Sequence, residues 1–445
     1  MPRKYAIMES VEAAVKAAWA AIDRERSYVT ELTRKMVQIP SVNPKFLKEP
    51  TQNREGAVQD LIEPTLESLG MAIDRWDVFP GRPNVVGQLA GSEKRSLLLC
   101  GHIDVVPIGE RSAWTMDPFG AEIKDGRLYG RGAIDMKSGL AAAIAAVRGI
   151  KAAGIELDGR VSIHSVIDEE AGGFGAIDAV KRGHLAKAAI ITEPSWGNIL
   201  VSEGGLEWIR VTITGRQGHS AWRYNEIWPQ RDEPDRPARA VNAIDIAARF
   251  LDALKHFESS RCRYRQHPLL PPGMNTINVG AMRAGAGLGR DGLPLVMTNP
   301  AIIPDVAVID LDYKFLPNQT KEDVRSEFEA FVHHFCQQDL WLQQNPIKVH
   351  WELSGLHFPP MNTPSDHPIA QSLFKRRVQL GGEPKITGFI AVADCAHYAG
   401  AGVDSMIYGA SGDGLHSSDE YVVIASLEET TKTLAAGIID WCGIR

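Results

Sequence analysis

Short hydrophobic runs that end in histidine or an acidic residue are the feature that most restricts how this chain can fold. Leu97–Cys100 is followed after one glycine by His102, and Ala188–Ile191 is followed after one residue by Glu193. We interpret such runs as buried strands, in which a polar side chain needs a specific partner. Ligands of parallel sheets gather at the carboxyl ends of the strands. The sequence therefore predicts a polar site at strand ends.

Strands and helices alternate over the first two hundred residues. Asn84–Leu89, Ser96–Cys100, Val161–Ile167 and Ala188–Ile191 are expected strands, and Ser138–Ala153 is an expected alanine-rich helix. This alternation is typical of α/β domains with a mostly parallel sheet flanked by helices. A chain of 445 residues also exceeds one ordinary domain, so we expect at least two.

A different pattern begins near Gly205. Leu206–Thr214 alternates apolar and polar residues, as half-buried antiparallel strands do. Further expected helices and strands follow at Ala240–His256, Thr276–Met282, Val306–Phe315, Lys321–Gln337 and Ile347–Leu353. A proline-rich link at Pro359–Pro368 then returns to helix and strand. We therefore predict a discontinuous first domain, residues 1–205 and 359–445, and an inserted α+β domain, residues 206–358.

Composition and charge exclude several classes of partner. The net charge of -7 provides no basic field for a phosphate backbone, so no nucleic-acid partner is expected. Residues 1–39 lack the apolar stretch of a signal peptide or membrane span, so we expect a cytoplasmic protein without membrane contact. The five cysteines form no C-x-x-C pair, which argues against disulfides and against a thiolate zinc site.

His102 and Asp104 form the first candidate pair. Residues two apart on an extended segment point to the same side. The imidazole could bind a metal ion while the Asp104 carboxylate accepts the other ring proton and orients the ring. A hydrogen-bonded histidine without a metal ion is the simpler alternative.

Further acidic and histidine positions each have an ordinary alternative. Asp135 could bridge two cations with its two oxygens, or it could cap the following helix. Glu169 and Glu170 close a strand, where one carboxylate could bind metal while its neighbour acts as a general base. Solvated loop residues are the alternative for this pair. Glu193 and His416 would each pass, alone, for a solvated strand-end carboxylate and a loop histidine.

Five motifs in this order resemble the M20 metallopeptidase family: GHIDVVP from Gly101, GRGAIDMKSG from Gly130, DEEAGG from Asp168, TEP from Thr192 and GLHSSDEYV from Gly414. The family includes acetylornithine deacetylase, succinyl-diaminopimelate desuccinylase, aminoacylase and glutamate carboxypeptidase. The resemblance extends over nearly the whole chain. It implies an α/β catalytic domain, an inserted lid and dimerisation domain, and hydrolysis of an amide bond.

The resemblance also implies a role for each candidate residue. Two divalent metal ions would share one bridging carboxylate, with the ligand sets His102, Asp135 and Glu193, and Asp135, Glu170 and His416. Asp104 would orient His102, and Glu169 would be the general base. Zinc is the usual metal of the family, and a carboxylate-rich set with two histidines also suits manganese or cobalt.

The inserted domain carries two further positions of the family pattern. His219, in the segment GRQGHSA from Gly215, resembles a lid histidine that reaches the active site of the partner subunit and donates to the developing oxyanion. A turn histidine is the ordinary alternative. Asn275 resembles a lid asparagine that faces the substrate. A histidine that acts in trans implies a homodimer whose closure gates catalysis.

Two features of the inserted domain depart from the family pattern. The family usually has D-x-R in a lid strand, where the arginine helps to bind a substrate carboxylate. This chain has Lys314 at that position, which is a candidate substrate-binding residue, although lysine cannot offer the bidentate guanidinium. Trp222–Arg239 is longer than usual and forms either an aromatic and cationic rim for a bulky anionic substrate or a solvated loop. Gly287–Gly292 spells G-x-G-x-x-G, but no helix start follows it, so we expect no dinucleotide site.

We therefore expect a metal-dependent amidohydrolase that acts on a small molecule, an N-acyl amino acid or a related small carboxylate. Within the family, the alternatives are a dipeptidase, a carboxypeptidase or an enzyme that cleaves another C–N bond, such as that of a carbamoyl group or an aromatic amine. A non-catalytic metal-binding scaffold is the alternative of a different class. The presence of Glu169 beside all five ligand positions argues against it.

Overall fold

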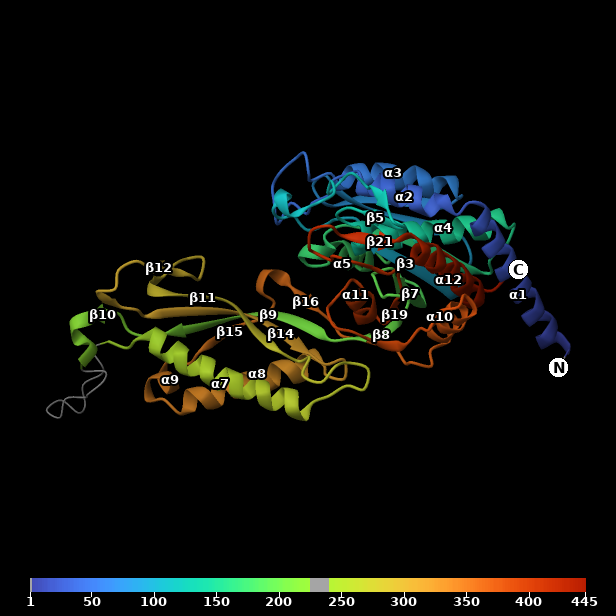
Figure 1. Cartoon of the computed structure of the whole chain (residues 1–445). Helices are drawn as coiled ribbons and strands as arrows, with labels where there is room; N and C mark the ends of the chain where they lie inside the picture. The colour runs from blue at the N-terminus through green and yellow to red at the C-terminus, as the bar shows by residue number, and fades with distance from the viewer. Residues whose placement is uncertain (1, 225–239) are drawn as a thin grey trace. The chain divides into compact units, whose positions relative to one another are not determined.

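The computed structural model describes residues 2–224 and 240–445, and Figure 1 shows the course of the chain. The chain divides into two compact units. Unit 1 comprises Met1–Glu203 and Met361–Arg445, and unit 2 comprises Gly204–Pro360. Unit 2 is thus inserted into unit 1, and unit 1 holds every candidate metal ligand.

A mostly parallel sheet forms the centre of unit 1, which confirms the predicted fold class. Within the described residues the sheet has nine strands in the order β1-β2-β6-β3-β7-β19-β8-β17, with β18 beside β8. Neighbours β6, β3, β7 and β19 run parallel, whereas β1, β2 and β17 pair antiparallel. The strands are β1 (Ala72–Phe79), β2 (Arg82–Leu89), β3 (Ser92–His102), β6 (Gly159–Val166), β7 (Ala188–Ile191), β8 (Ile199–Glu203), β17 (Met361–Asn362), β18 (Ile386–Phe389) and β19 (Asp404–Ile407).

Helices cover both faces of this sheet. They are α1 (Pro2–Arg24), α2 (Ser27–Val37), α3 (Glu55–Ser68), α4 (Ser138–Ala152), α5 (Phe174–Lys181), α10 (Pro368–Gln379), α11 (Cys395–Gly400) and α12 (Ile424–Cys442). Side chains alternate between faces along a strand. Gly101 of β3 accordingly lies against Leu140 of α4, whereas Cys100 packs in a core cluster with Ala176 of α5 and Tyr398 of α11. Layers on both faces bury β3 from Ser96 to its last residue, His102.

A small antiparallel sheet lies beside the start of α4. Its order is β20-β21-β5-β4, with β4 (Ile123–Lys124), β5 (Arg127–Tyr129), β20 (Gly412–Asp413) and β21 (Tyr421–Val423). Tyr421 pairs with Tyr129 in this sheet. Because of this pairing, the loop that carries His416 lies next to the segment that leads to Asp135.

Unit 2 is an α+β unit with helices on one face of an antiparallel sheet (Figure 1). Among its described residues, the sheet has six strands in the order β12-β11-β14-β9-β15, with β16 beside β9, and a separate ribbon pairs β10 with β13. The strands are β9 (Gly205–Thr214), β10 (Gly218–His219), β11 (Ile277–Leu288), β12 (Pro294–Val296), β13 (Ile302–Ile303), β14 (Val306–Phe315), β15 (Lys348–His350) and β16 (His357–Phe358), and the helices are α7 (Ala243–Tyr264), α8 (Lys321–Gln337) and α9 (Leu340–Gln344). Phe250 of α7 and Phe328 of α8 are fully buried in the core of this unit.

The expected strand Ile347–Leu353 is too long. Strand β15 covers only Lys348–His350, because Glu352 (φ 53°) and Ser354 (φ 61°) adopt left-handed backbone conformations that turn the chain. The segment Gly287–Gly292 lies at the end of β11 and in the turn to β12, so it joins two antiparallel strands and precedes no helix.

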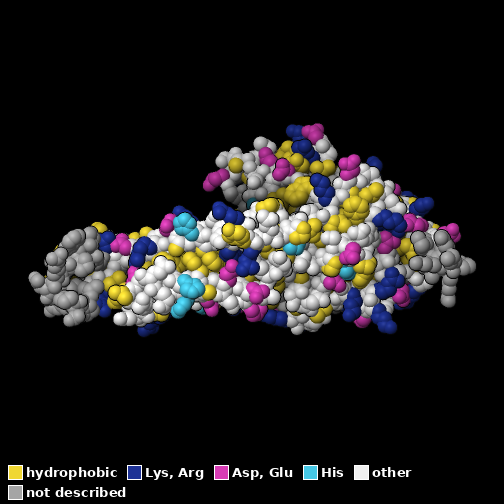
Figure 2. Space-filling view, turned by 90° about the horizontal axis from the view of Figure 1, so that it is seen from below, with side chains coloured by type: hydrophobic (Ala, Val, Ile, Leu, Met, Phe, Trp, Pro, Cys, Tyr) yellow, Lys and Arg dark blue, Asp and Glu magenta, His cyan; other side chains and the backbone are white. Residues whose placement is uncertain are grey.

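Hydrophobic, acidic and basic side chains are interspersed over the face that Figure 2 shows. A mixture of this kind is typical of ordinary solvated protein surface. In the described part of the chain, every helix falls short of the combined length and apolar character that a bilayer crossing requires.

Candidate metal centre

Close backbone packing at the carboxyl edge of the unit 1 sheet depends on two glycines. A Cβ atom at Gly139 would lie 1.9 Å from the carbonyl oxygen of Thr192, and a Cβ atom at Gly409 would lie 2.2 Å from that of Glu193. The start of α4 and the segment after β19 therefore approach this segment more closely than any side chain permits. The packing holds Glu193 at the edge where β3 ends in His102.

The ring of His102 is fully buried and is oriented by a backbone carbonyl group. Its Nδ1 atom lies 2.9 Å from the carbonyl oxygen of Asp104 and 3.6 Å from the Asp104 carboxylate, so the acceptor is a different atom from the expected one. The carboxylate instead accepts the backbone N–H groups of Glu169 (3.1 Å) and Glu170 (3.3 Å). A ring that donates through Nδ1 leaves Nε2 available as a metal ligand.

Asp135 lies in an irregular turn, Ala133–Lys137, just before α4. The carboxylate of Glu420 holds this turn, because it accepts the backbone N–H groups of Gly132, Ile134 and Asp135 at 3.0 to 3.1 Å. It also accepts Nη1 of Arg131 at 2.6 Å. Asp135 therefore does not cap α4, and its carboxylate is directed to the two histidines instead.

Two sets of candidate ligands meet at Asp135. Oδ1 of Asp135 lies 3.2 Å from Nε2 of His102, and Oδ2 lies 3.2 Å from Nε2 of His416. Glu193 lies 3.4 Å from the same nitrogen of His102, and Glu170 lies 2.9 Å from that of His416. The structure thus brings all five expected ligands together, with one oxygen of Asp135 directed to each histidine.

Glu169 lies at the margin of this cluster. Its carboxylate is 3.9 Å from Nε2 of His102, farther than those of Asp135 and Glu193. Ligand atoms of His102, Glu169 and Glu193 nevertheless lie within 4.8 Å of one another, as do those of His102, Asp135 and Glu170. Glu169 therefore lies beside His102 and Glu193, with its carboxylate farther from His102 than those of Asp135 and Glu193.

The four carboxylates of the cluster perturb one another. Burial raises the pKa of Glu169 well above its ordinary range, although His102 lowers it, and burial together with Asp135 raises the pKa of Glu170 to about 7. Hydrogen bonds with Asp135 and Glu170 raise the pKa of His416 to about 10. Burial and the neighbouring charges thus favour the protonated forms of Glu169, Glu170 and His416, whereas hydrogen bonds with the two histidines lower the pKa of Asp135.

These residues fit divalent metal ions. Carboxylate oxygens and imidazole nitrogens are ligands for zinc, manganese and cobalt, and metal ions take the place of protons on such groups. The histidine that is oriented through Nδ1 and the carboxylate with one oxygen toward each set match what two neighbouring ions require. Metal cations would also offset the charge that the four carboxylates share.

The three expected residues of the inserted domain lie in unit 2. His219 is exposed in β10, and its Nδ1 accepts the N–H of Ala221 at 3.1 Å, so the neutral ring carries its proton on Nε2. Asn275 is fully buried, and neither atom of its amide group has a hydrogen-bond partner among the described residues. Lys314 lies in β14, in register with Leu206 of β9.

Most of the stretch Trp222–Arg239 lies outside the described residues, which resume at Ala240. At its start, Arg223 forms an ion pair with Asp245 of α7, and the side chain of Tyr224 is exposed. The proposed aromatic and cationic rim therefore stays a hypothesis.

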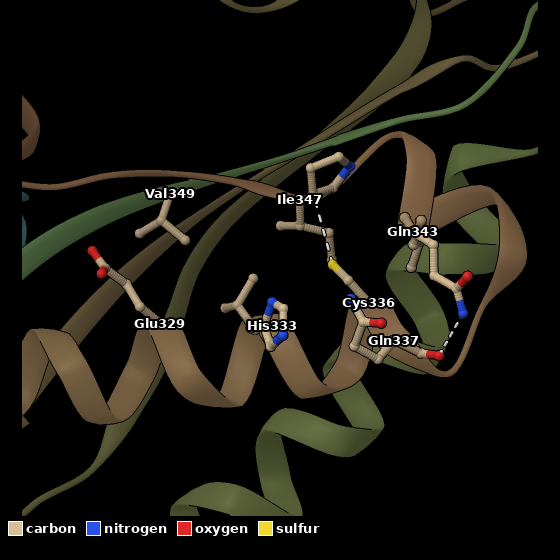
Figure 3. A pocket seen from close by; sticks show the side chains of 10 residues that line it. Glu329, His333, Cys336, Gln337, Gln343, Ile347 and Val349 are labelled. Atoms are coloured by element: carbon tan, nitrogen blue, oxygen red, sulfur yellow. Dashed lines mark hydrogen bonds between the residues drawn. The ribbon is translucent and has the colours of Figure 1, made fainter.

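A cavity of about 420 Å³ lies in unit 2 between α8, α9 and β15. Figure 3 shows His333 and Glu329 of α8 on one side of it and Ile347 and Val349 on the other. Cys336 closes its end and accepts the N–H of Ile347 at 3.5 Å. None of the described residues that line this cavity belongs to the candidate metal centre.

The sequence patterns did not single out two buried acids near the site, Glu420 and Asp394. Glu420 belongs to the motif that contains His416, yet only the folded chain shows that it binds the turn of Asp135. Asp394, before α11, is almost fully buried, and neither carboxylate oxygen has a hydrogen-bond donor among the described residues. Burial raises its pKa well above the ordinary range, although His102 lowers it, and Glu193 adds to the increase. The apolar run Phe389–Ala393 directly precedes this position in the sequence, yet Asp394 was not among the expected site residues.

Comparison with known proteins identifies the family. Residues 98–440 match peptidase family M20/M25/M40, and the chain belongs to this family. The expected metal-dependent amidohydrolase class is therefore confirmed, and the protein is an M20-family hydrolase.

The relatives differ in the acyl group that they remove. The chain is 32% identical over 435 residues to N-formyl-4-amino-5-aminomethyl-2-methylpyrimidine deformylase of Bacillus subtilis, covering 95% of this chain and 96% of the relative. It is 33% identical over 235 residues to succinyl-diaminopimelate desuccinylase of Caulobacter vibrioides, covering 51% of this chain and 53% of that relative.

Solved structures share the fold at low sequence identity. An aminopeptidase from Bacillus cereus superposes with a TM-score of 0.68 at 19% identity, covering 93% of this chain and 98% of that chain. A dinuclear metal-binding peptidase of the M20 family from Bacillus subtilis superposes with a TM-score of 0.61 at 15% identity, covering 94% of this chain and 99% of that chain.

The variant Glu420→Gln tests whether this buried carboxylate shapes the metal centre. We expect a loss of about 3 kcal/mol in unfolding free energy, because the amide group leaves Arg131 and backbone donors unpaired in a buried position. Metal affinity should fall in parallel, since the turn of Asp135 loses its support. Urea unfolding and metal titration measure the two effects.

Glu25→Gln is the matched control, because it removes an exposed pair with Arg148. We expect it to change stability by less than about 1 kcal/mol and to leave metal affinity intact. Wild-type stability and metal affinity in Glu420→Gln would show that the turn keeps its shape without this carboxylate.

Proposed function

We propose that this protein removes the acyl group from a small N-acylated amine with the help of two divalent metal ions. The observation that carries the proposal is the placement of Asp135, which directs one carboxylate oxygen to each histidine at the strand ends of unit 1. Zinc is the first metal to test, with manganese and cobalt as alternatives.

The ligand roles follow the two contact sets. His102, Asp135 and Glu193 would hold one ion, and Asp135, Glu170 and His416 the other. When bound, the ions would supply Lewis acidity, which polarises the substrate carbonyl group and makes water more acidic. Asp104 holds the Glu169–Glu170 segment through its carboxylate and orients His102 through its carbonyl group.

Glu169 is the general base of the proposed reaction. It takes a proton from the attacking water molecule and returns it to the leaving nitrogen when the amide bond breaks. Its greater distance from His102 than those of Asp135 and Glu193 supports this role, because a carboxylate that does not bind metal stays available for proton transfer.

An N-formylated aminomethylpyrimidine is the first substrate to test. The deformylase of Bacillus subtilis, which is aligned over 95% of this chain, supports this choice. Lys314 supports it as well. In the family pattern an arginine at this position binds a substrate carboxylate, and the formylated pyrimidine has no carboxylate. N-succinyl and other N-acyl amino acids are the second candidate class, supported by the likeness to the desuccinylases.

We further propose a homodimer in which His219 of one subunit completes the site of the other. The tautomer that the Ala221 N–H group favours leaves a proton on Nε2, and this N–H group can donate to the oxyanion. The buried amide group of Asn275, which has no partner among the described residues, supports a role in binding substrate. The five cysteines are free thiols, which supports a reducing compartment such as the cytoplasm.

Metal-stripped protein, assayed with and without zinc, manganese or cobalt, tests the function. The panel contains the formylated pyrimidine, N-formyl and N-succinyl amino acids, dipeptides, N-carbamoyl compounds and acylated aromatic amines. We expect metal-restored release of formate from the pyrimidine. Turnover of another class alone would reject the proposed substrate, and two bound ions without any turnover would favour a metal-binding scaffold.

Glu169→Gln tests the general base. We expect kcat to fall by a factor of about 10² to 10⁴, because the amide cannot take up the proton, while metal content stays near the wild-type value. Steady-state kinetics and elemental analysis measure both quantities. Glu170→Gln is the control, since it should lower metal content as well. A Glu169→Gln variant with wild-type turnover would exclude this role.

Mixing two inactive variants tests the action of His219 in trans. Subunits with His219→Ala and subunits with Glu169→Gln, co-expressed and randomly paired, should form half heterodimers with one complete site each, which gives about a quarter of wild-type activity. Differently tagged subunits allow the heterodimer to be isolated. An inactive heterodimer would show that His219 acts within its own subunit, and a monomeric protein would reject the dimer.

A further inference from the structure

The short turn that carries Glu169 is held at both ends by one lysine. Glu169–Ala171 forms a single turn of 3-10 helix that directly follows Asp168. Nζ of Lys45 donates to the carboxylate of Asp168 at 2.5 Å and to the carbonyl oxygen of Ala171 at 3.4 Å. One ammonium group thus joins the residue before the turn to the last residue of the turn.

Two aromatic rings fix the position of this ammonium group. Nζ of Lys45 lies 4.2 Å from the ring centre of Phe174 in α5 and 5.0 Å from that of Phe79 in β1. Cations are attracted to the faces of aromatic rings at such distances. The side chain is 37% exposed, yet its charged end has defined partners.

Asp168, which accepts the hydrogen bond from Lys45, is itself held by several contacts. It is fully buried, with a left-handed backbone conformation (φ 68°), and its Oδ1 accepts Nδ2 of Asn43 at 3.0 Å and Nη2 of Arg82 at 2.9 Å. The same amide group of Asn43 donates to Asp104 at 2.8 Å. Aspartate adopts this conformation more readily than most residues other than glycine, and here its carboxylate contacts help to hold it.

The two ends of the turn have different supports. Asn43 and Arg82 contact this turn only through Asp168, whereas Lys45 also contacts Ala171, beyond Glu169 and Glu170. The next residue but one, Gly173, has φ 70°, and a Cβ atom there would lie 2.2 Å from the ring of His397. Backbone hydrogen bonds from the N–H of Gly172 to the carbonyl oxygen of Glu169 (3.1 Å) and from the N–H of Gly173 to that of Asp168 (2.9 Å) close the turn, and Lys45 adds a side-chain hydrogen bond to its last residue.

We infer that Lys45 is a positioning residue for Glu169, because it fixes the turn from which the carboxylate of Glu169 extends toward His102. This inference rests on the proposed role of Glu169 as the general base. Small displacements of a reacting group lower rates strongly, so a loosened turn should reduce the chemical step more than it reduces substrate binding.

Lys45→Met tests the inference, because methionine retains much of the side-chain volume without the charge. We expect kcat to fall about 10- to 100-fold, with KM and metal content close to wild type. Lys375→Met is the matched control, since Nζ of Lys375 forms an exposed ion pair with Glu12 at 2.9 Å, and we expect it to keep wild-type kcat. Unchanged kcat in Lys45→Met overturns the inference. A lower kcat that excess metal restores also overturns it, because Lys45 would then act through the proposed metal ligand Glu170.

Chemical rescue separates positioning from general stability. Ethylammonium supplies the N–H donors and charge that Lys45→Ala lacks, whereas tetramethylammonium supplies only the charge. We expect ethylammonium to restore part of kcat and tetramethylammonium to restore none. Equal responses to the two cations would contradict a role that depends on the hydrogen bonds to Asp168 and Ala171.

Hydrogen–deuterium exchange tests the turn without any substrate. We expect the amides of residues 168–173 to exchange faster in Lys45→Met than in the wild type or in Lys375→Met. Unchanged exchange overturns the inference even if the true substrate is not in the panel. A wild type without hydrolase activity, or an active Glu169→Gln variant, would instead reject the proposed function. In that case the exchange experiment alone would decide whether Lys45 holds the turn.

Discussion

The accumulation of carboxylates around His102 is the constraint on which the rest of unit 1 depends. Asp135, Glu169, Glu170 and Glu193 are largely withdrawn from solvent at one edge of the sheet. Buried negative charges are costly unless donors or cations compensate them. The two histidines supply part of that compensation, and metal ions of the kind that the donor set fits would supply the rest. A site of this composition is stable only when its ligands are held together by surrounding structure.

Two other carboxylates hold this surrounding structure together, because they accept hydrogen bonds from backbone N–H groups instead of pointing to the metal centre. Glu420 accepts the N–H groups of Gly132, Ile134 and Asp135, and Asp104 accepts those of Glu169 and Glu170. Both carboxylates are fully buried. Each converts the free donors of an irregular loop into fixed hydrogen bonds, and so determines where the ligand on that loop points. The resulting preorganisation is what a catalytic centre requires, because its groups need not rearrange during the reaction.

Local patterns predicted most elements well and failed where the backbone turns. The expected strand Val306–Phe315 and the expected helix Lys321–Gln337 coincide with β14 and α8, because hydrophobic periodicity persists over their whole length. The strand expected over Ile347–Leu353 is shorter in the structure, because the hydrophobicity pattern does not reveal the left-handed backbone conformations that end it. The spacing of His102 and Asp104 predicted their proximity but could not distinguish the carbonyl oxygen from the carboxylate as the acceptor, because both lie on the same residue.

By itself, the sequence determined the class of fold, the strand ends at which polar residues stand and the family to which the chain belongs. These properties depend on local periodicity and on ordered motifs, which can be read from the amino-acid sequence alone. Only the tertiary structure decided which oxygen of Asp135 meets which histidine, that Glu420 binds the turn of Asp135, and that Lys45 holds the turn of Glu169. These contacts join residues that are far apart in the chain, and they exist because the packing of helices against the sheet fixes distances that sequence spacing does not specify.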